Sequence, residues 1–323
     1  MTSILDGQVV LVTGATGSFG RHFVARALET DVAKLIVFSR DELKQYELRQ
    51  EHEGEGRLRF FLGDVRDRER VYRAFDGVDL VVHAAALKQI PAAEYNPFEF
   101  VKTNVMGAQN IIDAAIDRRV RRVVALSTDK ASSPINLYGA TKLVSDKLFV
   151  AGNSYVGEHP SRFAVVRYGN VLGSRGSVVP YFRGLAPGDP VPLTDPRMTR
   201  FWITLDQAVQ LVLYALEAMR GGEIFVPKIP SMTMADMASA LAPEAQPEVI
   251  GIRPGEKLHE EMISENDARR TVDCGSHYVV LPDLDFGRER DPLGEPVPEG
   301  FQYSSDRNDD WLDAERLYGM LDE

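Results

Sequence analysis

Short, almost uninterrupted runs of valine, isoleucine and leucine alternate with helix-like segments through the first half of this 323-residue chain. Such runs predict strands that are covered on both faces, as in a parallel sheet. Strands that alternate with helices form right-handed βαβ units, so the pattern predicts a doubly wound α/β sheet of the Rossmann type. We expect strands at 9–13, 33–38, 58–62, 78–83, 122–127 and 162–167, and helices at 19–29, 41–51, 63–77, 98–116 and 138–151.

After residue 170 the pattern becomes irregular, and glycine and proline cluster in LGSRGSVVPYFRGLAPGDPVPLTDP. One further helix at 204–218 and a strand at 223–227 are expected to return to the sheet. We predict a Rossmann domain formed by 1–170 with about 203–228, and a smaller substrate-binding domain, mainly C-terminal, formed by 171–202 with about 229–323. The smaller domain would cover the carboxyl ends of the strands, where doubly wound sheets bind ligands.

Charge and composition exclude several classes of protein. With 48 acidic and 37 basic residues the net charge is −11, which disfavours a nucleic-acid or anionic-membrane binder. The single cysteine, Cys274, permits no disulfide within the chain, and the histidines lack HxxxH spacing, so no metal site is predicted. No apolar run approaches the ~18 residues of a membrane span and no signal-peptide pattern is present, so a cytoplasmic protein is expected.

A glycine-rich loop follows the first predicted strand, in VLVTGATGSFGRHFV. Glycines at this place allow a tight turn and let a pyrophosphate approach the backbone N–H groups that open a helix. Because the loop begins a βαβ unit, it predicts a dinucleotide site rather than a turn alone. The predicted contacts are Gly14, Thr16, Gly17, Ser18, Phe19 and Gly20.

Two cations follow the second predicted strand, where proteins that bind NAD usually carry an acidic residue for the ribose 2′-hydroxyl. Here Ser39 and Arg40 follow the strand, and Lys44 lies one helical turn later. A hydroxyl and two cations suit a 2′-phosphate, so NADP is predicted in preference to NAD. Asp41 keeps a ribose hydroxyl open as an alternative, and the two cations could instead be solvated surface residues.

Tyr138 and Lys142 lie four residues apart at the start of a predicted helix, so their side chains share one face. A nearby ammonium stabilises a phenolate, so Lys142 should lower the pKa of Tyr138 and make it a base for a sugar hydroxyl. Lys142 can also hold the nicotinamide ribose. Ser127 or Thr128, at the end of the preceding strand, would hydrogen-bond the same hydroxyl. Such a set of residues serves reversible hydride transfer.

The GxxGxxG and YxxxK motifs resemble those of the extended short-chain dehydrogenase/reductase superfamily. Nearly the whole chain is similar to one group within it, the inverting UDP-N-acetylglucosamine 4,6-dehydratases, which open bacterial pseudaminic acid biosynthesis. The segments that carry this resemblance are TGATGSFG, FSRDELKQ, AAALKQIPAAEYNP, LSTDKASSPINLYGATKL, VRYGNVLGSRGSVVPYF, FWITLDQAV, GEIFVPKIPSM and GIRPGEKLHEEMIS. Related glucose-nucleotide dehydratases carry Thr-Asp-Glu where this chain has Thr-Asp-Lys at 128–130.

The resemblance implies an oxidation, an elimination and a reduction, with a cofactor that is regenerated at each turnover. Tyr138 would remove the O4 proton as NADP⁺ accepts hydride from C4. Lys130, if neutral, would then remove the C5 proton, and burial near Lys88 and Lys142 would lower its pKa. Asp129, if protonated, would supply the proton with which the 6-hydroxyl leaves as water. Hydride would return to C6, and reprotonation of C5 from the opposite face would invert that centre.

Further contacts are predicted around the cleft. Asp64 and Val65 should lie near the adenine, Ala84 against the cofactor, and Lys88 between the cofactor and the smaller domain. By resemblance, Val171, Ser174 and Arg175 line the nicotinamide, and the protein is a homo-oligomer. The predicted contacts to a UDP-sugar substrate are Lys88, Ser127, Thr128, Asn170, Val178, Thr194, Arg253 and Glu256, among which Arg253 suits the diphosphate.

Two other functions use the same fold. A nucleotide-sugar 4-epimerase would need only Tyr138, Lys142 and a keto sugar that rotates in the site, and it has no task for Asp129 and Lys130. A non-catalytic NADP-sensing protein typically lacks the tyrosine or the lysine, and this chain has both. The sequence leaves open the stereochemistry at C5, the nucleotide and sugar of the substrate, the order of the oligomer and the pathway downstream.

Overall fold

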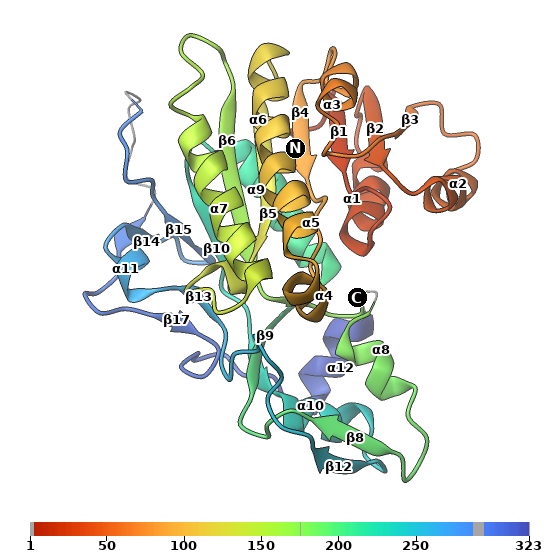
Figure 1. The fold of residues 1–323 in the computed structure, drawn as a ribbon, viewed down its shortest axis with the longest axis vertical. Coiled ribbons are helices and arrows are strands. Elements are labelled where there is room, and N and C mark those ends of the chain that lie inside the picture. Colours follow the sequence, from red (N-terminus) through yellow and green to blue (C-terminus); the bar gives the residue numbers. More distant parts are fainter. Residues whose placement is uncertain (1–2, 175, 287–293, 323) are drawn as a thin grey trace.

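A ten-stranded sheet forms the centre of the molecule in the computed structural model, which describes residues 3–174, 176–286 and 294–322 (Figure 1). The predicted doubly wound α/β fold is confirmed, and the strands expected in the first half lie within one or two residues of their predicted bounds. Neighbouring parallel strands make up most of the sheet, in the order β10 (Ile224–Pro227), β6 (Arg162–Tyr168), β5 (Arg122–Thr128), β4 (Leu80–His83), β1 (Val9–Thr13), β2 (Lys34–Ser39) and β3 (Leu58–Leu62).

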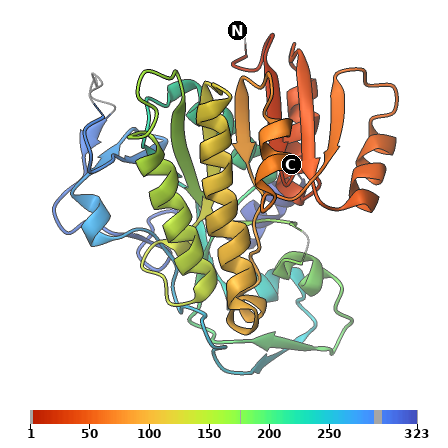
Figure 2. The ribbon, with the colours of Figure 1, turned by 45° about the horizontal axis from the view of Figure 1, so that its top comes forward.

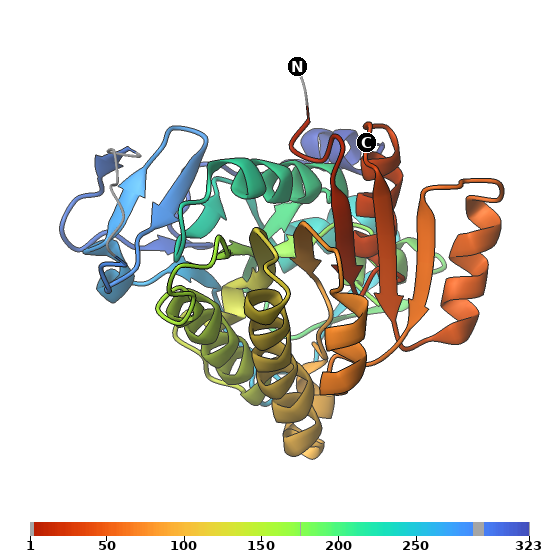
Figure 3. The same cartoon turned by 90° about the horizontal axis from the view of Figure 1, so that it is seen from above.

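Helices cover both faces of this sheet, as Figure 3 shows. On one face α1 (Ser18–Leu28) packs against α9 (Leu205–Ala218). On the other face α6 (Gly107–Asp117) packs between α3 (Arg68–Ala74) and α7 (Leu137–Gly152). The helix α2 (Glu42–Glu51) contacts β2 and β3 and lies beside α1, whose Arg21 forms an ion pair with Glu47 of α2. Strand residues such as Val10 and Val12 are completely buried. Burial on both faces explains the continuous apolar sequences of the strands.

The side of the sheet on which successive strands are added changes at β1, which lies between β2 and β4. The strands β2 and β3 extend the sheet on one side of β1, and β4, β5 and β6 extend it on the other. Doubly wound sheets bind ligands beyond the carboxyl ends of their strands at such a reversal. The loops that follow β1, β4, β5 and β6 are therefore in the position to form a site.

The helix expected over 98–116 is not one regular α-helix. It consists of α5 (Pro97–Phe100), a wider π-helical turn η1 (Val101–Met106) and α6, preceded by the short α4 (Ile90–Tyr95). The π-helical turn contains Asn104, whose side chain accepts from the N–H of Leu87 and donates to the carbonyl of Leu87, both at 2.9 Å. Asn104 also donates to Thr141 Oγ1 at 3.0 Å. This irregular turn thus ties the loop after β4 to α7.

A second, smaller group of elements lies at one end of the main sheet, as Figures 1 and 2 show, and it has a hydrophobic core of its own. It is built around Phe182, Trp202, Met237 and Leu317, which are all completely or almost completely buried. Its elements are β7 (Asn170–Val171), α8 (Val178–Arg183), β8 (Pro190–Leu193), β9 (Thr199–Ile203), β11 (Ser231–Thr233), α10 (Met234–Leu241), β12 (Gln246–Val249) and α12 (Ala314–Asp322). This smaller part faces the loops that follow the parallel strands.

The later part of the chain also contributes to the main sheet. The antiparallel strands β15 (His277–Val280), β14 (Thr271–Asp273) and β16 (Glu295–Pro296) extend it beyond β10, although 229–323 was predicted to belong to the smaller domain. Between them and the smaller part lie β13 (Glu261–Ile263), which pairs with β17 (Tyr303–Ser304), and α11 (Glu265–Ala268). Among the described residues no helix combines the length and apolarity needed to cross a membrane.

Candidate active site

A cavity of about 760 Å³ opens beyond the carboxyl ends of the parallel strands, between the Rossmann loops and the smaller part. Every predicted cofactor and substrate contact within the described residues lines it, and so do Thr128, Lys130, Tyr138 and Lys142. Arg175, predicted to lie beside the nicotinamide, is outside the described residues. Asp129 is fully buried behind the cavity wall.

The loop between β1 and α1 is shaped to accept the diphosphate of a dinucleotide. Gly14 has a φ of +67°, and a Cβ atom on it would lie 2.8 Å from the backbone of Ala84. A Cβ atom on Gly20 would lie 2.4 Å from Cα of Ala15, so both positions require glycine. The N-cap residue of α1 is Gly17, so no capping side chain bonds to the N–H groups of the first turn. Residues of this turn line the cavity. These features fit the predicted nicotinamide cofactor.

The cations after β2 also line this cavity. Arg40 Nη1 is 3.7 Å from Asp64 Oδ2, and Lys44 Nζ is 2.9 Å from Asp41 Oδ2. Asp41 also caps α2, because its Oδ1 accepts from the N–H of Lys44 at 3.0 Å. These hydrogen bonds from Lys44 keep the pKa of Asp41 below its usual value. Asp41 is thus engaged as a helix cap, whereas Ser39, Arg40 and Lys44 line the cavity.

Tyr138 and Lys142 project from the first turns of α7, whose N-terminus is capped by Asn136. Lys142 Nζ donates to the carbonyl oxygen of Leu126 at 2.7 Å. Burial raises the pKa of Tyr138 to about 12, and the largest opposing charge is that of Lys130. The expectation that Lys142 brings the pKa of Tyr138 toward the working range is therefore wrong for this arrangement.

The two hydroxyl residues at the end of β5 have different partners. Ser127 Oγ donates to Asp146 Oδ2 at 2.8 Å, and Arg167 Nη2 lies 3.3 Å from the same oxygen. This buried network holds β5 against α7 and β6. The hydroxyl of Thr128 instead helps to lower the pKa of Tyr138, so Thr128 is the better placed of the two to share a substrate hydroxyl with that residue.

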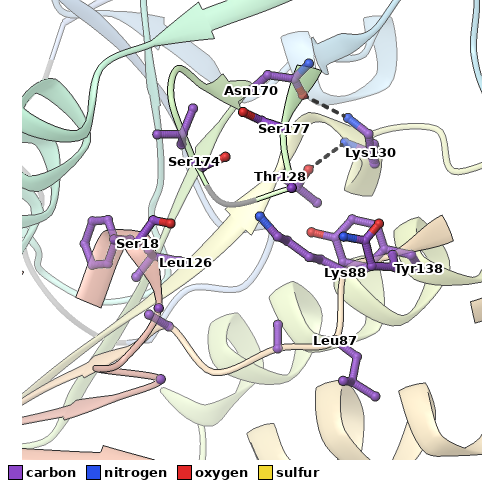
Figure 4. Close-up of a pocket in the computed structure, with 18 of the residues that line it drawn as sticks. Ser18, Leu87, Lys88, Leu126, Thr128, Lys130, Tyr138, Asn170, Ser174 and Ser177 are labelled. Atoms are coloured by element: carbon purple, nitrogen blue, oxygen red, sulfur yellow. Dashed lines mark hydrogen bonds between the residues drawn. The ribbon is translucent and has the colours of Figure 1, made fainter. Parts of the chain in front are cut away.

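The turn η2 (Asp129–Ala131) carries a charged cluster, and Figure 4 shows its Lys130 on the cavity wall beside Thr128 and Asn170. Lys130 Nζ lies 2.9 Å from Asp129 Oδ1, 3.1 Å from Glu260 Oε1 and 3.4 Å from Asn170 Oδ1. Burial alone would lower the pKa of Lys130, but the two carboxylates outweigh burial and hold this pKa above its ordinary value. The expectation that burial near Lys88 and Lys142 lowers the pKa of Lys130 is therefore wrong.

The pKa values of Lys88 and Asp129, which lie near Lys130, are shifted in opposite directions. Burial and the charge of Lys130 lower the pKa of Lys88. Burial raises the pKa of Asp129, which is the direction that a proton donor needs. Asp129 Oδ2 is buried without a hydrogen-bond partner among the described residues, while Oδ1 accepts from Thr128 at 2.9 Å. Asp129 therefore reaches the cavity through side chains that it contacts.

Sequence reasoning missed two residues of this cluster, Glu260 and Arg200. Glu260 is 2 % exposed, and Arg200 Nε lies 3.8 Å from its Oε1. Glu260 belongs to the segment GEKLHEEMIS, but it lies 130 positions from Lys130 in a different part of the chain. An unusual run of charged residues before a buried strand was the only available signal, and it does not name a partner.

The predicted contacts to the nucleotide, Thr194, Arg253 and Glu256, also line the cavity. The side chain of Arg253 is 54 % exposed, and its Nη1 lies 3.9 Å from Glu256 Oε1. A loose, exposed ion pair of this kind costs little to rearrange, so the guanidinium is available to an incoming anion. Thr194, nearby on the cavity wall, donates to the sulfur of Met198.

A small residue next to Tyr138 sets the distance between η2 and α7. A Cβ atom on Gly139 would lie 2.1 Å from the carbonyl oxygen of Lys130. We expect Gly139→Ala to displace the η2 turn and lower kcat by about 10² or more, because misplaced catalytic groups lose much of their effect. Bound cofactor should be retained. A wild-type kcat in Gly139→Ala would contradict this prediction. Gly157→Ala is the control: Gly157 has a positive φ but open space around it, so this variant reports the effect of backbone strain on stability without a displaced η2 turn.

The fold and the site define an enzyme of the extended short-chain dehydrogenase/reductase class that uses a nicotinamide cofactor. Residues 10–282 match the model of a family described as "Polysaccharide biosynthesis protein". The chain belongs to this family.

Curated relatives support the resemblance predicted from the motifs. The chain is 49% identical to a Campylobacter jejuni protein named "UDP-N-acetylglucosamine 4,6-dehydratase (inverting)", over 98% of each chain. It is 42% identical to a Rickettsia canadensis protein named "UDP-glucose 4-epimerase", over 85% of this chain and 83% of the relative. The predicted membership of the dehydratase group is confirmed by the first of these.

Solved structures show the same architecture. Pen from Bacillus thuringiensis superposes with a TM-score of 0.90 at 34% identity, over 98% of each chain. DesIV, a dTDP-glucose 4,6-dehydratase from Streptomyces venezuelae, superposes with a TM-score of 0.67 at 26% identity, over 77% of this chain and 86% of DesIV. The DesIV structure has NAD bound, which supports a nicotinamide cofactor in this fold.

Proposed function

We propose that this protein is a 5-inverting UDP-N-acetylglucosamine 4,6-dehydratase that uses NADP. The observation that carries the proposal is the Asp129–Lys130 ion pair, whose lysine lines the same cavity as Tyr138 while its carboxylate is buried behind the wall. Hydride transfer needs Tyr138 and Lys142, but the removal of water needs a further base and acid. A 4-epimerase has no use for that second pair, although a relative at 42% identity bears that name.

The side chains divide the reaction into proton transfers. Tyr138, with Thr128 beside it, accepts the proton of the O4 hydroxyl. Lys130 accepts the C5 proton once it has given one of its own to Asp129, whose Oδ1 is 2.9 Å away. A nicotinamide cofactor, held by the loop after β1, would supply the hydride acceptor for C4 and the hydride donor for C6. The 6-hydroxyl leaves with the proton from Asp129. Water on the opposite face then gives C5 a proton with inverted configuration, which balances the proton that Tyr138 took from O4.

Transfer of one proton within the ion pair explains how Lys130 can act as a base despite its raised pKa. The charged pair becomes a neutral amine and a neutral carboxylic acid, which are the two forms that the elimination needs. Burial favours these neutral forms, since it raises the pKa of Asp129 and opposes the charge of Lys130. Asp129 does not line the cavity, so its proton would reach the 6-hydroxyl through Lys130 or Thr128, which both contact it.

NADP is favoured by the residues around the adenosine ribose. Ser39, Arg40 and Lys44 line the cavity, whereas the nearby carboxylate of Asp41 is occupied by Lys44 and the helix cap. Asp64 is paired with Arg66 at 2.7 Å as well as with Arg40. A 2′-phosphate would therefore meet a hydroxyl and cations rather than an unpaired carboxylate.

Arg40→Ala is expected to weaken the binding of NADP by about 10–100-fold and the binding of NAD by less than about threefold. The reason is that a hydrogen bond to a charged group contributes roughly 1.5–3 kcal/mol. The check is the dissociation constant of each cofactor, measured on protein freed of bound nucleotide. Equal weakening for both cofactors would contradict the assignment of the 2′-phosphate to Arg40. Arg49→Ala, which removes a cation from the same helix region outside the cavity, is the matched control.

One incubation tests the proposed function. Purified protein is mixed with UDP-N-acetylglucosamine without added cofactor, and the mass of the product is followed. Loss of one water supports the dehydratase, and a spectrum that assigns C5 then decides the inversion. An isomer of unchanged mass would support the 4-epimerase instead. If the substrate is unaltered and active cofactor is confirmed in the site, the result would support a non-catalytic NADP-sensing protein.

A further inference from the structure

We propose that Glu260 is a positioning residue for Lys130, and that Asp129, Lys130 and Glu260 act as one acid–base unit. This inference rests on the proposed dehydratase function and extends it. Of the three side chains, Lys130 lines the cavity, whereas Asp129 and Glu260 are 0% and 2% exposed. The unit therefore meets the substrate through the amine of Lys130, with both carboxylates held behind it.

The geometry accounts for every hydrogen of the Lys130 ammonium. An ammonium has three N–H donors, and three acceptors surround Nζ: Asp129 Oδ1, Glu260 Oε1 and Asn170 Oδ1. They come from three separate segments of the chain. A lysine side chain has a flexible four-carbon stem, so a single partner would leave Nζ free to turn. Glu260 supplies the second charged partner and so fixes the direction of Nζ.

Glu260 is itself held firmly, and its neighbours fasten the same segment to the catalytic turn. Its N–H donates to Ser305 Oγ at 2.9 Å, and its carbonyl accepts from the N–H of Ser305 at 2.8 Å. Lys257 Nζ donates to the carbonyl of Ser132 at 2.7 Å, and Glu261 Oε1 accepts from Ser132 Oγ at 2.8 Å. The 257–261 segment thus positions the loop that carries Lys130.

The charge of Glu260 acts on both of its partners. Burial would raise the pKa of Glu260, but Lys130, Arg200 and Lys257 outweigh burial and keep the carboxylate ionised. Its charge in turn raises the pKa of Lys130 and adds to the raised pKa of Asp129. The charged and titratable groups that face the unit are Asp129, Lys130, Glu260, Arg200, Lys257, Lys88 and Tyr138.

Glu260→Gln tests the unit, because glutamine keeps the shape of the side chain and one acceptor oxygen but removes the charge. The reaction needs one proton shared between Asp129 and Lys130, so kcat should fall at low pH when both are protonated and at high pH when neither is. Loss of the negative charge of Glu260 lowers the pKa values of Asp129 and Lys130. The acid limb and the alkaline limb of the plot of kcat against pH should therefore both move to lower pH. We expect kcat to fall about tenfold or more, KM to change less than about threefold, and bound reduced cofactor to accumulate because C4 oxidation is spared.

Two matched variants separate charge from structure. Glu261→Gln removes the adjacent carboxylate, which contacts Ser132 rather than Lys130, and it should keep the wild-type positions of both limbs. Glu260→Asp keeps the charge but shortens the reach, so kcat should stay low while the limbs stay near their wild-type positions. Thermal unfolding of each variant reports whether it folds. If Glu260→Gln does not fold, Glu260→Asp is used for the test instead.

The outcomes are distinct from those for the proposed function. If the wild-type protein removes no water from UDP-N-acetylglucosamine, the proposed dehydratase fails before Glu260 is considered. If the wild type does so and Glu260→Gln retains both kcat and the wild-type limbs, the role of Glu260 is overturned. A fall in kcat with unmoved limbs in both Glu260→Gln and Glu260→Asp would reduce Glu260 to a structural residue and would also overturn the unit.

Discussion

Lys130→Ala is expected to oxidise C4 of the substrate normally but to stop before water is lost. Without the amine nothing accepts the C5 proton, so turnover should fall by about 10²–10⁴-fold, the usual effect of removing a general base. Hydride that has left C4 cannot then return to C6. Bound reduced cofactor should therefore build up, and its near-ultraviolet absorbance after mixing with substrate is the measurement.

Folding must be separated from chemistry in this test, because Lys130→Ala leaves the buried carboxylates of Asp129 and Glu260 without their common cation. Removal of one partner from a buried ion pair costs roughly 3–5 kcal/mol of stability. Lys130→Arg is the matched variant: it keeps the charge, but a guanidinium cannot be deprotonated in a protein and cannot act as the base. It should unfold near the wild-type temperature and still accumulate reduced cofactor. Wild-type product formation by either variant would remove Lys130 from its role.

The main sheet could be predicted from sequence because most of its parallel strands are buried on both faces. A run such as VVLVT at 9–13 is typical of an interior strand, and the predicted bounds are those of β1 in the structure. The site followed from the same logic. Residues that come directly after parallel strands, such as Gly14, Lys88 and Lys130, converge at one edge of the sheet even though they are far apart in the chain.

The electrostatics of the site could not be predicted in this way. The sign of the pKa shift of Lys130 depends on which charges lie within about 4 Å, and motif spacing suggested Lys88 and Lys142. The nearest charges are carboxylates, one adjacent in sequence and the other, Glu260, brought in by the second part of the chain. Lys142 was likewise predicted to face Tyr138, but its ammonium is directed at the carbonyl of Leu126. Both errors come from tertiary contacts.

Irregular backbone was the other limit. The apolar pattern over 98–116 predicts one helix, and it contains no proline or glycine pair that would announce the π-helical turn at Val101–Met106. That turn includes Asn104, which bonds to Leu87 and Thr141. Its stabilisation comes from residues outside the helix, so local sequence could not reveal it.

Tyr138→Phe is expected to stop the reaction at its first step. Phenylalanine keeps the buried ring but removes the group that accepts the O4 proton, so the rate of C4 oxidation should fall by about 10²–10⁴-fold. Burial raises the pKa of the wild-type Tyr138 to about 12, so its phenolate is a minor form near neutral pH. The wild-type rate of cofactor reduction in a single turnover should therefore rise with pH, and the residual rate of Tyr138→Phe should not show this rise.

Combining the two substitutions determines the order of the steps. Lys130→Ala alone should accumulate reduced cofactor, whereas Tyr138→Phe alone should not. If Tyr138 acts before Lys130, the double variant must behave like Tyr138→Phe and show no absorbance of reduced cofactor on addition of substrate. Accumulation in the double variant would mean that another group accepts the O4 proton. Lys88 would then be the next residue to test, because burial lowers its pKa and it lines the same cavity.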